Sequence, residues 1–212
     1  MILKVSPTRV TLLNLKKELK VAQKGYKLLK DKRDGLMKVF MGVIREARAL
    51  RSDIEDRLGD AFATYARASS LIHNKSLDTV FLEPGVTLRL DVETKHVMSV
   101  PVPTFTVEKE GDPYAYGMLE SNGDLDTSIE KFDEVLADII RLAGLEKTAE
   151  QLAEEIERTR RRVSALENTR IPNLQDTTRF ITQQLEERAR DAVVSTMRVK
   201  AMILAKEEAG EQ

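Results

Sequence analysis

Apolar residues in the first third of the chain recur at alternating steps of three and four. The series starts at Leu12 and continues to Ile54, with Arg33 as its one interruption. A seven-residue repeat kept over about six heptads predicts a coiled-coil seam and a left-handed supercoil. Pro7 directly follows Ser6, which suits a first helical turn capped by the serine. We therefore predict a long N-terminal helix over residues 4–70.

A second periodic segment fills the C-terminal part of the chain, over residues 125–207. Pro172 lies within it, where the missing N–H should kink or locally unwind the helix. The spacing of the repeat changes at the same place, because eight residues separate Leu166 from Leu174. We predict a long, bent second helix, followed by a flexible tail over 208–212. The predicted seam consists of Leu12, Leu15, Leu19, Leu29, Leu36, Phe40, Val43, Leu50, Ile54, Leu152, Ile156, Val163, Leu166, Ile181, Leu185 and Val199.

The connecting region, residues 71–124, has a different period. From Val86 to Val92 apolar and polar residues alternate, which is typical of a half-buried strand. A second apolar run, 97–107, contains Pro101 and Pro103, so it is predicted to be an edge strand or an irregular arm. Together the two runs predict a small β-hairpin at about 86–107.

Two long helices separated by a compact insertion can return past each other only as an antiparallel pair. Residues 1–70 carry 16 Lys and Arg against 8 Asp and Glu, whereas residues 120–212 carry 14 against 20. Opposite net charges favour this pairing, although exposed ion pairs contribute only about 0–1 kcal/mol each. The predicted fold is mainly α: a long antiparallel two-helix coiled coil with the β-hairpin inserted at its turn end.

Four glycines interrupt the first predicted helix, at positions 25, 35, 42 and 59. Each costs about 1 kcal/mol relative to alanine in a helix. They could permit close approach of another backbone or local bending, and the sequence leaves both alternatives open.

The amino-acid composition fits such a fold and also indicates the cellular compartment. A third of the residues are charged, 5% are aromatic and there is no Trp, which is typical of long helices that bury a narrow seam. Cysteine is absent, which excludes disulfides and thiolate metal sites. No signal peptide and no run of about 20 apolar residues is visible. We expect a cytosolic protein with no direct membrane insertion.

Motifs for catalysis or cofactor binding are weak. Gly144 to Thr148 has the Gly-x-x-Lys-Thr end of a nucleotide-binding loop but lacks its first glycine and lies in a predicted helix. His73 and His96 belong to no ligand cluster, and no spacing matches a Ser-His-Asp or paired-carboxylate site. We expect no enzyme activity in the isolated chain, no cofactor and no metal.

Two basic clusters remain as candidate binding surfaces. The first is a run of lysines that ends in Lys27, Lys30, Lys32 and Arg33, and the second is Arg160, Arg161 and Arg162. Each cluster could be a solvated helix face or a docking surface for acidic protein loops. Nucleic-acid binding is the weakest interpretation, because the opposite arm is acidic and few aromatic residues are available for stacking.

Several short motifs, in matching order and spacing, resemble those of the D subunit of V/A-type ATPases. They are Ser6–Arg9, Leu28–Asp34, Val97–Pro103, Tyr116–Gly117, Arg160–Glu167 and Ile171–Pro172. Each motif is weak alone, but the likeness covers about residues 4–205. Gly35 stands directly after the second motif, where a better helix former is expected.

The resemblance implies a rotor subunit in the central stalk, on the cytoplasmic side of the cell membrane and peripheral to it. Implied partners are the F subunit of the stalk, a ring of catalytic A and B subunits, and a funnel-like subunit that joins the shaft to the membrane rotor ring. Nucleotide sites would belong to A and B. Under this interpretation Lys27, Lys30, Lys32, Arg33 and Arg160–Arg162 meet acidic loops of the ring, and the hairpin modulates activity or contacts stalk subunits.

The heptad pattern alone also permits a free-standing cytosolic coiled-coil scaffold or adaptor. Binding to an A/B ring and to the F subunit would distinguish the two. A nucleic-acid-binding basic helix is a second alternative, for which strongly salt-dependent binding would be diagnostic.

Overall fold

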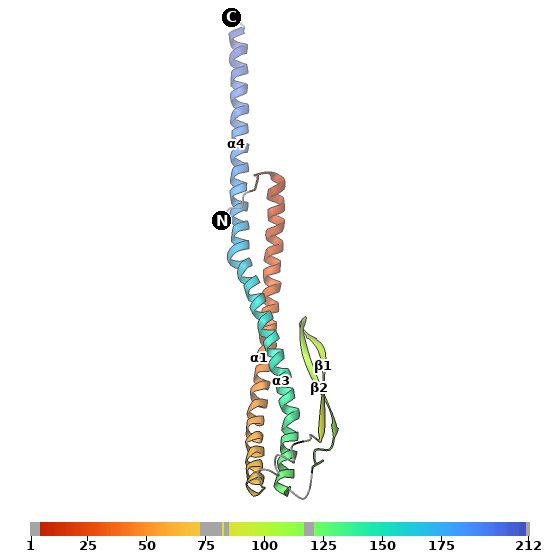
Figure 1. The fold of residues 1–212 in the computed structure, drawn as a ribbon. Coiled ribbons are helices and arrows are strands. Elements are labelled where there is room, and N and C mark those ends of the chain that lie inside the picture. The colour runs from red at the N-terminus through yellow and green to blue at the C-terminus, as the bar shows by residue number, and fades with distance from the viewer. Residues whose placement is uncertain (1–4, 73–81, 83–84, 117–120, 211–212) are drawn as a thin grey trace. The chain divides into compact units, whose positions relative to one another are not determined.

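The structure is a computed structural model that describes residues 5–72, 82, 85–116 and 121–210. Its elements are helix α1 (Arg9–Leu71), strands β1 (Val86–Val97) and β2 (Val100–Gly111), helix α3 (Gly123–Ala165), a π-helical turn η1 (Leu166–Arg170) and helix α4 (Ile171–Gly210) (Figure 1). The predicted fold class is confirmed, because long N-terminal and C-terminal helices flank a two-stranded antiparallel hairpin. The chain divides into two compact units.

Element bounds differ from the sequence-based expectations in several places. Helix α1 begins at Arg9 and not near residue 4, and Thr8 caps it in place of Ser6, because the Thr11 N–H donates to Thr8 Oγ1 at 3.2 Å. The second strand continues to Gly111, beyond the expected limit of 107, because Val107 to Gly111 stay paired with β1. Helix α4 extends to Gly210, into the segment expected to be a tail. Parts of the expected connecting region and the last two positions of the expected tail lie outside the described residues, as do His73 and Gly117.

The first unit consists of Met1–Arg33 and Arg158–Gln212. Leu15, Leu174 and Ile181 are buried at its centre, flanked by Leu12, Leu19, Ala22 and Leu185. Glu18 forms an ion pair with Arg170 at 3.1 Å, and the Arg188 guanidinium donates a hydrogen bond to the Pro7 carbonyl at 3.0 Å. The partner of Arg170 in η1 is Glu18, whereas the partner of Arg188 in α4 is Pro7, just before α1. Residue numbers thus rise in one segment as they fall in the other, so the two segments pair antiparallel.

Pro172 has the local effect that the sequence predicts. The five residues before Ile171 form the π-helical turn η1 instead of continuing the α-helix. Proline lacks an N–H and clashes with the carbonyl four residues earlier, and a wider turn relieves both problems. A π-turn also accommodates one extra residue, which accounts for the eight-residue step from Leu166 to Leu174.

The second unit, Asp34–Glu157, contains the remainder of α1, most of α3 and the hairpin. Ion pairs join the two helices, with Arg57 to Asp138 at 2.5 Å and Arg141 to Glu46 at 2.8 Å. Both signs of charge occur on both helices in these pairs. Net charge difference between the arms is therefore not what aligns the helices here.

A short polar contact fixes the start of α3 against the end of α1. Asn122 accepts a hydrogen bond from the Leu125 N–H at 2.9 Å, as an N-cap residue does. The Asn122 amide also donates to the Ala68 carbonyl at 3.2 Å. Leu125 and Ala68 are fully buried beside this contact. One side chain thus caps one helix and ties it to the other.

The hairpin packs along the helices instead of only closing their turn. Figure 1 shows β1 and β2, in yellow and green, running beside α3. Val100 and Val102 of β2 are buried against Leu36 of α1 and against Leu152 and Ile156 of α3. Lys109 adds an ion pair to Asp133. The hairpin is therefore part of the core of this unit.

Two helical glycines face the hairpin closely. A Cβ added at Gly35 would lie 2.8 Å from Met98 Cε, and one at Gly144 would lie 3.3 Å from Phe105 Cδ2. At Gly25, Gly42 and Gly59 an added Cβ meets nothing within 4 Å. Close approach is thus the explanation for Gly35, where the sequence had left bending as an alternative.

The substitutions Gly42→Ala and Gly35→Ala should separate these two kinds of glycine. Gly42→Ala is expected to raise the free energy of unfolding by about 0.5–1 kcal/mol, because alanine is the better helix former and space is open. Gly35→Ala should gain less, because the Met98 side chain must move. Urea unfolding measures the difference. The Met98 methyl resonance should shift in Gly35→Ala alone, and an equal shift in Gly42→Ala would contradict the assignment.

Most predicted seam residues are buried or half-buried. The buried ones are Leu15, Leu36, Ile54, Leu152, Ile156, Val163 and Ile181, and the half-buried ones are Leu12, Leu19, Leu29, Phe40, Val43, Leu50, Leu166 and Leu185. Val199 differs, since it is 50% exposed and no described residue covers it. The heptad pattern continues along α4 past its contacts with α1, so periodicity alone placed Val199 in the seam.

Candidate functional site

The seven basic residues singled out from the sequence all belong to the first unit. Lys27, Lys30, Lys32 and Arg33 lie on α1, and Arg160–Arg162 lie on α3. The first unit carries 21 Lys and Arg against 10 Asp and Glu, a net charge of +11. The second unit carries 13 against 25, a net charge of −12. A net charge of −1 thus conceals one strongly basic unit and one strongly acidic unit.

A hydrogen bond across the helix pair aligns the two clusters. The Tyr26 hydroxyl donates to Glu167 Oε1 at 3.1 Å. Arg33 follows Tyr26 by seven residues, and Arg160 precedes Glu167 by seven, so each lies about 10 Å from that contact in the same direction. The antiparallel pairing therefore brings both clusters to one level of the coiled coil.

The orientation of the three arginines follows from their buried neighbours. Thr159 and Val163 are 2% and 3% exposed and face the partner helix. Successive helical residues are about 100° apart, so Arg161 points directly away from the seam and Arg160 and Arg162 lie on its two flanks. All three arginines are exposed, so the second cluster covers a broad part of the helix surface.

The residues on α1 divide into two classes. Lys27 and Lys30 are exposed, whereas Lys32 and Arg33 are half-buried. Lys32, Arg33 and Arg161 already interact with other residues of the chain. We call Lys27, Lys30 and Arg160–Arg162 the basic patch, since these five are the exposed members of the predicted set. Lys32 and Arg33 contribute charge but are partly enclosed.

A second exposed surface of the first unit is apolar and lies on the C-terminal turns of α4. The later turns of α4 carry Val193, Val194, Met197, Met202 and Ile203, each 47% to 64% exposed. No described residue covers them. Because successive helical residues are about 100° apart, these side chains project on several sides of the helix and not along one face. An exposed apolar surface of this extent is typical of an interaction surface.

Charge counts over each whole arm, residues 1–70 and 120–212, did not reveal the acidic character of the second unit. Asp53, Asp56 and Asp60 of α1 are exposed, and so are Asp124 and Glu134 of α3. These carboxylates come from different arms, and the folding of one arm onto the other collects them. Counting charges separately for each half of an arm would have revealed the signal, because residues 1–33 hold 10 basic against 2 acidic residues.

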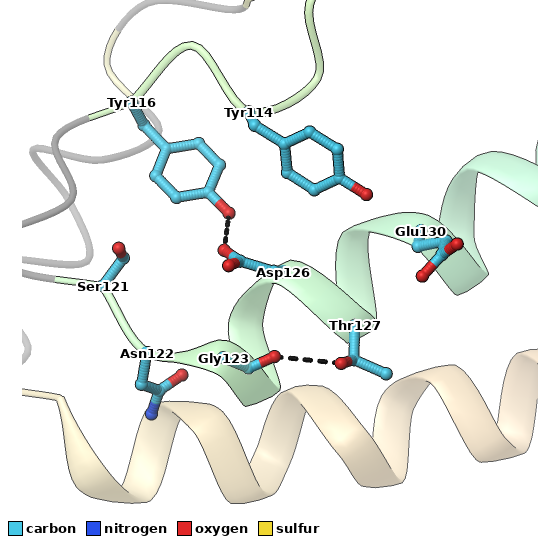
Figure 2. Close-up of a pocket in the computed structure, with 8 residues that line it drawn as sticks. All are labelled: Tyr114, Tyr116, Ser121, Asn122, Gly123, Asp126, Thr127 and Glu130. Atoms are coloured by element: carbon cyan, nitrogen blue, oxygen red, sulfur yellow. Dashed lines mark hydrogen bonds between the residues drawn. The ribbon is translucent and has the colours of Figure 1, made fainter.

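A shallow pocket lies where the hairpin region meets the start of α3 (Figure 2). Tyr116 donates a hydrogen bond to Asp126, and Tyr114, Thr127 and Glu130 lie nearby. Burial, and then the hydrogen bond to Asp126, raises the pKa of the Tyr116 hydroxyl well above its usual value of 10.0. The pocket holds a structural contact between loop and helix.

Alkaline titration should reveal this contact. The raised pKa means that the folded state keeps the Tyr116 proton at a pH where the unfolded chain loses it, so its contribution to stability is complete below pH 10 and falls above it. Tyr116→Phe is expected to be less stable than the wild type at pH 8 and to show a different change in stability between pH 8 and 11. Thermal melts at both pH values measure this, with Tyr114→Phe as the control. Parallel curves for wild type and Tyr116→Phe would contradict it.

The candidate nucleotide-binding motif does not form a phosphate-binding loop. Gly144 to Thr148 lie inside α3, where Thr148 Oγ1 donates to the Gly144 carbonyl at 2.8 Å, so their backbone N–H groups cannot cradle a phosphate. Among those residues no group of three His, Cys, Asp or Glu side chains could hold a metal ion. Nor is any helix, as far as the structure describes it, long and apolar enough to cross a bilayer.

Comparison with known proteins gives a consistent result. A family model described as the D subunit of ATP synthase matches residues 11–201. The V-type ATP synthase D subunit of Clostridioides difficile (strain 630) is 42% identical over 207 residues, covering 96% of this chain and 93% of the relative. Those of Acetivibrio thermocellus and Fusobacterium nucleatum subsp. nucleatum are 41% and 39% identical, covering 96% and 95% of this chain and 93% and 97% of the relatives.

Proposed function

Because this chain belongs to the ATP synthase D-subunit family, we propose that it is the central-stalk rotor subunit of a V/A-type rotary ATPase. In this role it transmits torque between a catalytic A/B ring and a membrane rotor ring, and so couples ATP hydrolysis or synthesis to proton or sodium transport. The chain is not catalytic and needs no cofactor. It acts at the cytoplasmic side of the cell membrane, peripheral to it.

The observation that best supports the proposal is the combination found in the first unit. This unit pairs two helices over a buried seam, carries a net charge of +11, and leaves the apolar end of α4 uncovered. An axle inside a ring needs a stiff body, an apolar end that the ring can enclose, and charges that meet ring residues of opposite sign. We assign the basic patch to acidic loops of the ring.

Asymmetry explains how such a shaft could drive its neighbours. A ring of equivalent catalytic subunits is biased toward different conformations only if the axle contacts each one differently. The basic patch comes from two helices and faces several directions, with Arg161 opposite to the seam and Lys27 on the other helix. Rotation therefore presents a changing charge to each subunit in turn.

We assign the second unit to binding of the remaining partners. The F subunit is proposed to bind the exposed coiled coil, and a funnel-like subunit to join the shaft to the membrane rotor. The acidic carboxylates around Asp53–Asp60 and Asp124–Glu134 suit basic surfaces on these partners. Direct binding to nucleic acid is disfavoured by this acidic unit.

Copurification tests the proposal. The full chain is expressed with the F subunit and the A/B ring of one of the related organisms, and complex mass and ATPase activity are measured with and without the chain. We expect a stoichiometric complex with one copy per ring and altered hydrolysis, and no hydrolysis by the chain alone. A chain that ignores both partners and forms a homodimer would identify a scaffold instead, and strongly salt-dependent DNA binding would favour the nucleic-acid alternative.

A further inference from the structure

The hairpin turn determines which backbone groups of β1 face outward. Met98 and Ser99 have φ values of 51° and 69°, so they form a two-residue turn closed by the pair Val97 and Val100. Hydrogen-bonded and non-hydrogen-bonded pairs alternate along an antiparallel ladder, beginning with the bonded closing pair. Pro101 and Pro103 then occupy non-bonded positions, where a missing N–H costs nothing. The prolines thus agree with this assignment.

The partners of these positions on β1 direct their backbone N–H and C=O groups away from β2. They are Leu88, Leu90, Val92, Thr94 and His96. The Val92 N–H donates to the neighbouring carboxylate of Asp91 at 2.9 Å, as expected for a group that the ladder does not use. Within the part of the chain that the structure describes, no other element supplies a backbone partner to this edge. Residues 87–96 are exposed throughout.

The two edges of the hairpin are not equivalent. The outer edge of β2 carries the two prolines, which block strand addition, and β2 also provides the side chains that pack on the helices. Strand β1 is 12 residues long and has no proline. A long, unblocked edge strand is a template for pairing with another chain.

The apolar face of β1 is only partly covered. Leu88, Leu90 and Val92 are 44%, 52% and 53% exposed, although their alternation predicts a half-buried strand. They share a face with Phe105, which packs against Gly144. A further strand beside β1 would extend this face and cover the three side chains.

We propose that the outer edge of β1 is a docking site for an extended segment of a different protein chain, which adds to the hairpin as a third strand. Backbone hydrogen bonds to Leu88, Leu90, Val92, Thr94 and His96 provide the affinity. Side chains of the added strand cover the apolar face and provide the specificity. The inference rests on the hairpin alone and does not require the proposed rotor function.

The charges of β1 favour a strand of different sequence over a second copy of this chain as the occupant. In the antiparallel self-pairing with the fullest overlap, centred on Val92, Arg89 lies opposite Lys95 and Asp91 lies opposite Glu93. Like charges directly opposite each other destabilise a sheet. Moving the centre by one residue sets Asp91 or Glu93 against its own copy, although it also brings Arg89 opposite Glu93 or Asp91 opposite Lys95. None of these self-registers sets all four charges against opposite charges, which a strand of different sequence can do.

The same charges indicate the charge pattern of a complementary partner strand. Along β1 the charged face reads basic, acidic, acidic, basic. A complementary strand reads acidic, basic, basic, acidic on that face and alternates with β-branched apolar residues on the other. The order is the same in both directions, so the complement fits a parallel or an antiparallel strand.

A designed peptide tests this site on the full chain. The probe is a fluorescein-labelled, acetylated peptide of the length of β1, with valine alternating with glutamate, lysine, lysine and glutamate. Fluorescence anisotropy measures binding, and amide hydrogen exchange by NMR reports on the edge. We expect fast exchange at Leu88, Leu90, Thr94 and His96 in the free chain and slowed exchange with the peptide. A peptide with all charges reversed should bind more weakly.

Matched variants identify the backbone contact. Thr94→Pro removes one outward N–H and leaves the ladder intact, as Pro103 opposite shows, and should raise the dissociation constant about tenfold. Thr94→Ala keeps the N–H and should stay within about twofold. Leu90→Lys places a charge on the apolar face and should weaken binding while far-UV circular dichroism is unchanged.

Three results would overturn the proposal. The first is equal binding by Thr94→Pro and Thr94→Ala, and the second is edge amides that are protected in the free chain. The third is a wild-type dimer in sedimentation that Thr94→Pro dissociates, which would make a second copy the occupant. Because all three use the isolated chain, failure here leaves the copurification test of the rotor function unaffected.

Discussion

Replacing Lys30, Arg160 and Arg162 together by glutamate is expected to lower ATP-driven ion transport by the assembled complex at least about tenfold. These side chains are exposed members of the basic patch, on both helices at one level. Reversing them changes the local charge by six and turns attraction to acidic ring loops into repulsion. Removing one partner of a buried interfacial pair costs about 2–5 kcal/mol, and each 1.4 kcal/mol is about tenfold.

The control reverses three exposed basic residues of the acidic unit, Lys38, Arg48 and Lys147. This variant has the same change in net charge and should keep transport within about twofold. Both triple variants should unfold at nearly the wild-type temperature, because exposed charges contribute little to stability. Equal loss of transport in both variants would mean that total charge matters and the basic patch does not.

Leu36→Ala is expected to destabilise the chain by about 2–5 kcal/mol, the largest effect on stability that we predict for a single substitution. Leu36 is 0% exposed and contacts Val100 and Val102 of the hairpin as well as Leu152 and Ile156 of α3. The cavity would lie where three elements meet, so the surroundings cannot easily collapse into it. Urea unfolding, followed by circular dichroism, measures the loss.

Leu28→Ala on the same helix is the matched control. Leu28 is 69% exposed, and its truncation should change stability by no more than about 0.5 kcal/mol. Limited proteolysis provides a second readout, since Leu36→Ala should also expose the hairpin to cleavage. If the two variants unfolded at the same urea concentration, the hairpin would not belong to the core of the second unit.

The helices were predictable because their seam repeats in the sequence. Burial of Leu15, Leu36, Ile54 and Ile181 follows from periodicity alone. Pro172 likewise indicated the place of the helix irregularity, because its missing N–H acts locally. Val199 shows the limit of this reasoning, since a repeat states which face is apolar but not how far a partner helix extends.

The details of the hairpin were less predictable from the sequence. Its turn, Met98 and Ser99, lacks the Asn-Gly or Asp-Gly signal that usually identifies positive φ. The sequence therefore did not locate the turn, and the two prolines left an irregular arm as an alternative to a second strand. Pairing explains why β2 tolerates Pro101 and Pro103. Docking onto Gly35 and Gly144 depends on contacts between residues distant in the chain, which a single sequence does not reveal.

The same limit applies to the candidate site. Both basic clusters were found as runs of like residues, but their shared level depends on which residues pair, as Tyr26 with Glu167 does. The enclosure of Lys32 and Arg33 likewise required packing. Ring contact by the basic patch stays a prediction.

The π-helical turn η1 makes chain length at this point as important as chemistry. The heptad frame before Leu166 and the frame after Leu174 are out of phase by one residue, and η1 absorbs the offset. Deleting Asn168 would leave a step of seven residues from Leu166 to Leu174, so a uniform α-helix would keep both in the seam without a π-turn. Converting η1 into regular α-helix without a deletion would instead rotate the following helix by about 100°, and Leu174 and Ile181 would leave the interface although neither was changed. A single-codon deletion is therefore tolerated at η1, whereas the same deletion in a regular part of either neighbouring helix would put all later seam residues out of phase.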